Sequence, residues 1–92
     1  MQVEVQAHMT LNSATAISQL TPGETGIVEG IHLPEERQLH FLELGIVPGE
    51  TLRYIRRSPW KDPIIVEVLG VQLAIRSSDA SAIMVRRPEK RK

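Results

Sequence analysis

The chain of 92 residues can form one small domain, since 41% of its residues are hydrophobic and 24% are charged. It has no cysteine, which excludes a disulfide framework and any site that depends on a thiolate. Its formal net charge of zero argues against a protein that binds nucleic acid mainly through the phosphates.

The sequence carries no visible targeting or membrane signal. No segment approaches the roughly 20 consecutive apolar residues of a membrane span, and residues 1–6 lack the basic start and apolar run of a signal peptide. We therefore expect a cytoplasmic protein that does not span a membrane.

The basic residues are unevenly distributed along the chain, since only Arg37 among the 11 basic residues precedes Thr51. Strands from both halves of a small β domain interleave, however, so we expect positive and negative charges to be mixed over the surface.

The first elements are an extension, a turn and a strand. Residues 1–16 alternate briefly and then turn small and polar, which predicts a variable N-terminal extension. A Pro22-Gly23 turn leads into a strand over Thr25 to Ile31. Gly26 and Gly30 interrupt that strand, which indicates bulges or a close backbone approach in a tightly curved barrel.

A short helix follows, from Glu35 to Leu44. Pro34 suits the first helical position, and the acidic residues behind it lie beside the positive end of the helix dipole. Leucine and phenylalanine recur at helical spacing and form a broad apolar side, which we expect to close one end of the core. Its members are Leu39, Phe41, Leu42 and Leu44.

The end of the helix is the joint around which the rest of the chain pairs. Gly45 suits the left-handed position after the last helical residue, and Ile46 can then fold back onto the last turn. Pro48-Gly49 fits the two central positions of a type II turn, where the chain reverses direction. We expect the structural turns to depend on Gly23, Gly45, Pro48, Gly49 and Gly70.

The second half of the chain reads as strands, turns and a basic end. The predicted segments are a strand over 51–57, an irregular loop over 58–63, a hairpin over 64–76 turning at Gly70, a single helical turn over 77–82, a strand over 83–85 and a basic tail over 86–92. About five short strands and one short helix predict a mainly β fold, a small barrel over residues 17–85.

Motifs in a fixed order run through residues 17–85. They are Ile17-x-x-Leu20-x-Pro22-Gly23-Glu24, Leu39-x-x-Leu42-x-Leu44-Gly45-Ile46-x-Pro48-Gly49, Asp62-Pro63-Ile64-x-Val66, Gly70, Leu73-Ala74-Ile75-Arg76 and Ala80-x-x-Ile83-x-Val85. This set resembles the FeoA family, ferrous iron transport protein A. The resemblance implies an SH3-like barrel and an accessory role beside FeoB, a membrane permease with a cytoplasmic G-domain. It also implies kinship with the C-terminal module of iron-dependent repressors.

The sharpest candidate for metal binding is the set Glu36, His40 and Glu43. At spacings of four and three, these side chains share one side of the predicted helix and could offer two carboxylates and an imidazole to ferrous iron or a surrogate divalent ion. The alternative is a solvated polar face, which we favour because exposed helix sides normally carry such residues. No P-loop, nucleophile elbow or histidine pair at metal spacing occurs, so we expect no enzyme activity.

The loop that carries Trp60 could bind RNA or a protein, or it could pack on the barrel. Arg53, Arg56 and Arg57 lie near Tyr54 and Trp60, a composition used for RNA, but three aromatic residues in the whole chain supply few stacking platforms. We therefore expect no nucleic acid partner. Trp60 either anchors a protein partner or folds over the mouth of the barrel.

We predict a non-enzymatic regulatory module that binds the cytoplasmic part of FeoB and so lies at the inner face of the membrane. The alternative is a metal-binding or metal-sensing module related to the repressor domains. The predicted partner surface joins the end of the helix to the Pro59–Pro63 loop, through Leu44, Ile46, Val47, Pro48 and Trp60. The sequence leaves self-association open.

Overall fold

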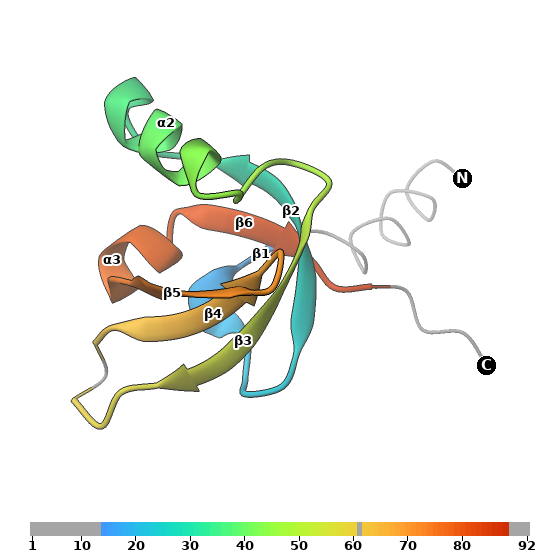
Figure 1. The fold of residues 1–92 in the computed structure, drawn as a ribbon, viewed down its shortest axis with the longest axis vertical. Helices are drawn as coiled ribbons and strands as arrows, with labels where there is room; N and C mark the ends of the chain where they lie inside the picture. Colours follow the sequence, from blue (N-terminus) through green and yellow to red (C-terminus); the bar gives the residue numbers. More distant parts are fainter. Residues whose placement is uncertain (1–13, 61, 89–92) are drawn as a thin grey trace, which may run out of the picture.

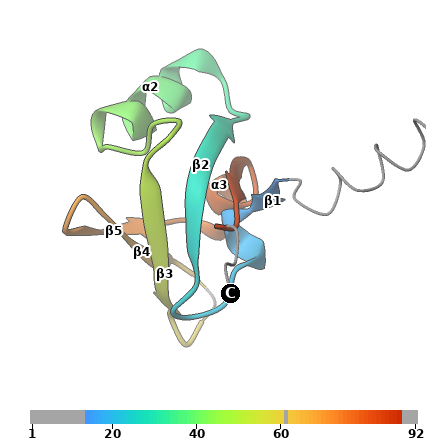
Figure 2. The same ribbon diagram turned by 90° about the vertical axis from the view of Figure 1, so that its right-hand side faces the viewer.

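The computed structural model describes residues 14–60 and 62–88. One antiparallel sheet of six strands, in the order β1-β6-β2-β3-β4-β5, forms the body of the molecule. The sheet is not closed (Figure 1), but it curls, so that β5 runs across behind β2 and β3 in the view of Figure 2. The strands are β1 (Thr15–Ala16), β2 (Thr25–Ile31), β3 (Thr51–Arg57), β4 (Ile64–Val68), β5 (Val71–Ile75) and β6 (Ile83–Arg86). The predicted mainly β fold is confirmed, with β1 as an additional short strand.

The core lies inside the curl of the sheet. Strand β4 alternates buried and half-buried residues, as a strand with one face on a core must. In β3 the same alternation buries Leu52 and Tyr54 and leaves Arg53 exposed. The 3-10 helix η1 (Ile17–Gln19) adds the fully buried Ile17. The buried side chains form a single apolar cluster.

The glycines of β2 mark a close approach and a bulge, as the sequence predicts. A Cβ atom at Gly26 would lie 2.7 Å from Cγ2 of Val85, so only glycine lets β6 pack this close. The register between β2 and β6 shifts between Val28 and Gly30, which is the predicted irregularity.

Both ends of the sheet extend past the range 17–85 that the sequence indicates for the barrel. Thr15 and Ala16 pair with Val85 and Met84 of β6, so the sheet takes in the last two residues of the predicted extension. At the other end, Arg86 belongs to β6. Backbone pairing across the sheet, which local composition does not reveal, causes the difference. The remainder of the extension and residues 89–92 lie outside the described residues.

Arginines at the start of the predicted tail form ion pairs with the domain. Nε of Arg86 lies 2.8 Å from Glu29, and Nε of Arg87 lies 3.0 Å from Glu24. Both pairs join residues that are more than 50 positions apart in the sequence. The first two residues of the predicted basic tail are thus in contact with the folded domain.

The helical turn α3 (Ser77–Ala80) is capped by a residue from another part of the chain. The N–H of Ser77 donates to Oδ1 of Asp62 at 2.6 Å, while no side chain at the N-cap position itself forms a cap bond. This bond, aided by the charges of Arg76 and Arg57, lowers the pKa of Asp62. The predicted capped turn therefore exists, but its cap comes from the β3–β4 loop.

Helix α2 (Glu35–Glu43) stands at one end of the sheet (Figure 1) and buries only Phe41. The expected broad apolar side is wrong in part, because Leu39 is 54% exposed and Leu44 40% exposed. A nine-residue helix at the rim of the sheet presents one narrow stripe to the core. Pro34 occupies the N-cap rather than the first helical position.

Candidate partner-binding surfaces

The end of α2 is a Schellman motif. The N–H of Gly45 donates to the carbonyl of Leu42, and the N–H of Ile46 donates to that of Phe41, both at 3.0 Å. Gly45 has a φ of +102°, which confirms the predicted role of this glycine. The helix therefore ends at a fixed residue, and the following chain leaves it in a fixed direction.

The Pro48-Gly49 turn is also as predicted. The N–H of Glu50 donates to the carbonyl of Val47 at 3.0 Å, and Gly49 has a φ of +96°, as a type II turn requires. We call residues 44–50 the joint. Two consecutive turns held by hydrogen bonds make the joint a rigid support for its exposed side chains.

The joint exposes only some of the residues predicted to bind a partner. Leu44 and Pro48 are exposed and Val47 is half-buried, so these three can be reached. Ile46 is completely buried, and its place in a contact surface is therefore a wrong prediction. The Schellman motif turns Ile46 back toward the core, so its side chain serves the fold.

A hairpin that is distant in sequence extends the exposed apolar surface of the joint. The side chain of Leu69 lies against Gly45, because a Cβ atom at Gly45 would be 3.0 Å from Cδ1 of Leu69. Leu69 is 65% exposed and Val71 55% exposed. We call Leu44, Leu69 and Val71 the apolar patch. Sequence reasoning missed the hairpin residues, although a leucine in a two-residue turn, where Asn or Asp is usual, was a visible signal.

Trp60 lies far from the joint. It is 85% exposed, which decides against the alternative in which it covers the barrel. It follows the C-terminal end of β3, whereas the joint precedes the N-terminal end of that strand. A seven-residue strand spans about 20 Å. The prediction of one surface that joins Trp60 to the joint is therefore wrong, because β3 separates them.

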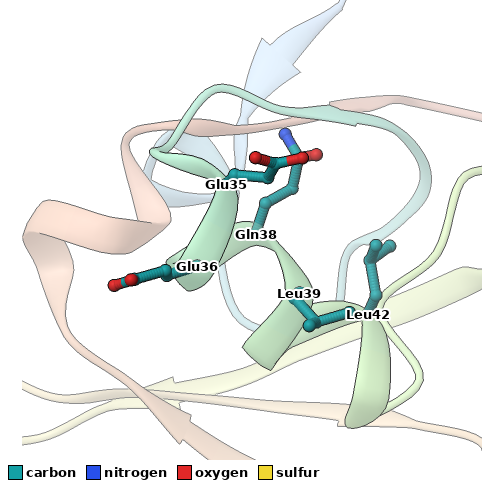
Figure 3. A pocket seen from close by; sticks show the side chains of 5 residues that line it. All are labelled: Glu35, Glu36, Gln38, Leu39 and Leu42. Carbon is teal, nitrogen blue, oxygen red and sulfur yellow. The ribbon is translucent and has the colours of Figure 1, made fainter.

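The exposed side of α2 borders two neighbouring cavities. One has a volume of about 390 Å³, and Figure 3 shows Leu39 and Leu42 side by side in it, with Glu36 pointing away from them. The other, of about 460 Å³, lies toward the end of β2 and shares Gln38 and Leu42 with the first. Nε2 of Gln38 donates to the carbonyl of Ile31 at 2.7 Å, and this hydrogen bond holds the side chain that lines both cavities.

The predicted metal residues Glu36, His40 and Glu43 are all exposed on α2. The rings of His40 and Phe41 pack in a T-shaped arrangement, with the centroids 5.2 Å apart. Within residues 14–60 and 62–88, no three His, Cys, Asp or Glu side chains form a group that could hold a metal ion. Metal binding by Glu36, His40 and Glu43 therefore stays a hypothesis, because these side chains do not converge on one point in the structure.

Two ion pairs hold charged side chains of the described residues in place. Arg37 binds Asp79, the one buried charged residue of the described part, and so ties α2 to α3. The Arg87 guanidinium and the N–H of Thr21 lower the pKa of Glu24 to about 2. The charges of Asp79 and Glu24 are therefore balanced by arginines of the same domain, Arg37 and Arg87.

None of the helices in the described part of the chain is long and apolar enough to cross a membrane.

Solved structures with similar folds come from two kinds of protein. The crystal structure of an iron uptake regulatory protein, FeoA, has 32% sequence identity and a TM-score of 0.73, and the match covers 83% of this chain and 99% of that chain. The zinc complex of Stenotrophomonas maltophilia FeoA, a prokaryotic SH3 domain protein, has 29% identity and a TM-score of 0.68, covering 78% and 89%. A manganese-dependent transcriptional repressor in complex with manganese has 25% identity and a TM-score of 0.75, but the match covers 82% of this chain and only 37% of the repressor.

The sequence itself supports the same relationship. No curated protein sequence matches this chain. The FeoA domain model, however, matches residues 15–87, which agrees with the span from β1 to the Arg87 ion pair. Because this match covers most of the sequence, the chain belongs to the FeoA domain family.

Proposed function

We propose that this protein is a non-enzymatic accessory factor of ferrous iron uptake, which binds the cytoplasmic part of a FeoB-type permease. Membership of the FeoA family supports the link to iron uptake. The observation that carries the binding role is the apolar patch of Leu44, Leu69 and Val71 on a rigid support. The protein then works on the cytoplasmic side of the membrane, held there by its partner.

The backbone of Leu69 supports a role in binding. Its φ is +54°, a left-handed conformation that is unfavourable for leucine, and its side chain remains 65% exposed. Neither turn geometry nor core packing therefore accounts for a leucine here. An exposed apolar side chain in a strained turn is typical of a residue retained for contact with a partner.

A capture experiment tests this surface. The cytoplasmic domain of the permease is immobilised, and retention of Leu69→Asn is compared with that of the unchanged protein. Asparagine suits the left-handed turn and removes the apolar contact, so we expect a folded protein with at least tenfold weaker capture. Trp60→Ala is the matched control, since it removes a larger exposed apolar residue at the other end of β3. Equal capture of Leu69→Asn and the unchanged protein would contradict the proposed surface.

A second candidate function is a metal-binding or metal-sensing module. Two relatives with the same fold were solved with zinc or manganese, which favours testing this chain for divalent ions. The ligands would be Glu36, His40 and Glu43, which would have to change side-chain conformation to converge on one ion, with water completing a weak site. Calorimetric titration with ferrous iron under anaerobic conditions, and with zinc, should show binding that is lost when all three become alanine. Unchanged affinity in the triple variant would reject these ligands.

A further inference from the structure

The loop between β3 and β4 holds Trp60 in a defined, outward position. The N–H of Ser58 donates to the carbonyl of Pro63 at 3.0 Å, and the N–H of Trp60 donates to Oγ of Ser58 at 3.3 Å. Oγ of Ser58 also donates to the carbonyl of Asp62. These bonds close the loop on itself, yet they leave the indole 85% exposed. The most exposed large apolar side chain of the described residues thus follows a residue, Ser58, whose backbone and side chain are both held by hydrogen bonds.

Basic side chains lie beside this loop on one face of the sheet. Arg56 pairs with Ile65, which pairs with Ala74, so these three share a face across β3, β4 and β5. Arg76, two residues after Ala74, continues that face and lines a cavity of about 400 Å³ with Asp62 and Pro63. Arg56 and Arg76 are exposed and have no ion pair within the described part of the chain.

Other charges at this end are already engaged. Nη2 of Arg57 donates to the carbonyl of Ser18 at 3.3 Å, although its side chain remains exposed. The carboxylate of Asp62 accepts the N–H of Ser77. The described loop end therefore carries two exposed arginines near an exposed tryptophan, and the charge of one of them, Arg76, also acts on the nearby carboxylate of Asp62.

This combination matches the interfacial region of an anionic bilayer. An indole has an apolar body and a polar N–H and prefers the headgroup level, while arginines are attracted to acidic lipids. We propose that Trp60, with Arg56 and Arg76, binds the surface of membranes that contain anionic phospholipids. The apolar patch lies at the other end of β3, so this contact leaves it free for a protein partner.

Single-stranded RNA could also use arginines and an aromatic ring, but the structure favours the membrane. RNA binding of that kind stacks successive bases on several aromatic side chains. Tyr54 is 3% exposed and Phe41 4% exposed, so neither can accept a base. Trp60 is the only exposed aromatic residue of the three in the chain. One indole supports a shallow, reversible interfacial contact better than an RNA-binding platform.

The single tryptophan of the chain provides a direct test. The full-length protein is mixed with phosphatidylcholine vesicles that contain either no or 50% phosphatidylglycerol, and the indole emission is recorded. We expect a blue shift only with the anionic vesicles, and we expect 0.5 M salt to reverse it. Arg56→Gln combined with Arg76→Gln should weaken vesicle binding roughly thirtyfold at low salt, since each arginine strengthens it about fivefold.

Arg53→Gln is the matched control, because Arg53 lies on the same strand but 3.6 Å from Glu67, with which it pairs. It should bind vesicles almost as the unchanged protein does, and circular dichroism should show all variants folded. Trp60→Ala, followed by vesicle flotation, should bind at least tenfold more weakly. The proposal is overturned if anionic vesicles give no blue shift, if Arg53→Gln weakens binding as much as the double variant, or if only poly(U) or millimolar inorganic phosphate changes the emission. Each outcome is independent of FeoB capture.

Discussion

Gly45 has a backbone conformation that other residues adopt at a cost. Its φ of +102° lies beyond the usual left-handed region, and its N–H takes part in the Schellman motif. An added side chain would first meet the flexible end of Leu69, at 3.0 Å from Cβ. The backbone conformation is therefore the larger obstacle to substitution, and the clash with Leu69 the smaller.

Gly45→Val should lower the free energy of unfolding by about 1 to 3 kcal/mol, because a β-branched residue is strained at this φ. Chemical denaturation followed by circular dichroism measures the change. Gly30→Val is a useful comparison, since a Cβ there would meet only the end of His32 at 3.8 Å and no positive φ is required. A midpoint that does not change in Gly45→Val would contradict the role of Gly45 in ending α2.

Glu24 is the residue whose ionisation should affect stability most visibly. The guanidinium of Arg87 and the N–H of Thr21 favour the charged carboxylate and lower its pKa from 4.5 to about 2. A carboxyl group with a lowered pKa in the folded state stabilises the fold when it is ionised in both states, above about pH 4.5. This contribution is lost as the pH falls from about 4.5 toward 2.

We expect Glu24→Gln to be less stable than the unchanged protein at pH 7, with a difference that shrinks as the pH approaches 2. Denaturation curves at pH 7, 4 and 2.5 test this. The difference should also fall at high salt, since both partners are partly exposed. A stability difference that is the same at all three pH values would show that the Arg87 contact does not depend on ionisation.

At the scale of elements, the β4–β5 hairpin combines a favourable and an unfavourable turn residue. Leu69 and Gly70 both have positive φ, as the type I′ turn of a two-residue hairpin requires. Glycine adopts this conformation readily, whereas leucine does so at a cost of roughly 1 kcal/mol. The hairpin is therefore less stable than its strands would allow.

Leu69→Asn should raise the free energy of unfolding by up to about 1 kcal/mol, because asparagine tolerates the left-handed conformation. Thermal unfolding would measure the gain. The same substitution should weaken FeoB capture, so stability and binding should change in opposite directions. A destabilised variant would mean that the contact of Leu69 with Gly45 outweighs the strain of the turn.

Helix α2 shows how a short helix is held at the rim of the sheet. Nine residues form a marginal helix in isolation. Phe41 supplies its buried contact, and Arg37 reaches Asp79 while its guanidinium carbon lies 5.7 Å from the centre of the Phe41 ring. The helix is held by the buried Phe41 side chain, by the ion pair of Arg37 and by the Schellman motif. The side of the helix that carries Leu39 remains exposed to solvent.

At the scale of the whole molecule, the curl of the sheet depends on the contact between β2 and β6. A Cβ atom at Gly26 would lie 2.7 Å from Cγ2 and 2.8 Å from Cβ of Val85. Both residues are buried, so neither strand can move away without loosening the core. The absence of a side chain at position 26 thus lets two strands distant in sequence pack together.

Gly26→Ala should therefore destabilise the protein by about 1 to 3 kcal/mol through overpacking. Val85→Ala should also destabilise it, by removing buried apolar surface. The double variant should lose somewhat less stability than the sum of the two single variants, because Val85→Ala removes the contact with Cγ2 at 2.7 Å, while the contact with Cβ at 2.8 Å remains. Additive losses in denaturation experiments would argue against a direct contact between these positions.

Local patterns in the sequence determined most of the elements. Alternating residues predict β3 and the hairpin, while glycine and proline locate the turns at 23, 45, 49 and 70, all of which have positive φ. These features depend on backbone preferences within a few residues, so they can be predicted without the path of the chain. The ordered motifs were also sufficient to indicate the FeoA family.

Only the tertiary structure decided which of these residues could form a surface. It buries Ile46, leaves Leu39 exposed, brings Leu69 against Gly45 and separates Trp60 from the joint by the length of β3. It also supplies the cap of α3 from Asp62, 15 residues earlier. Each of these outcomes depends on contacts between distant segments, which the twist and pairing of the sheet set and which no local pattern encodes.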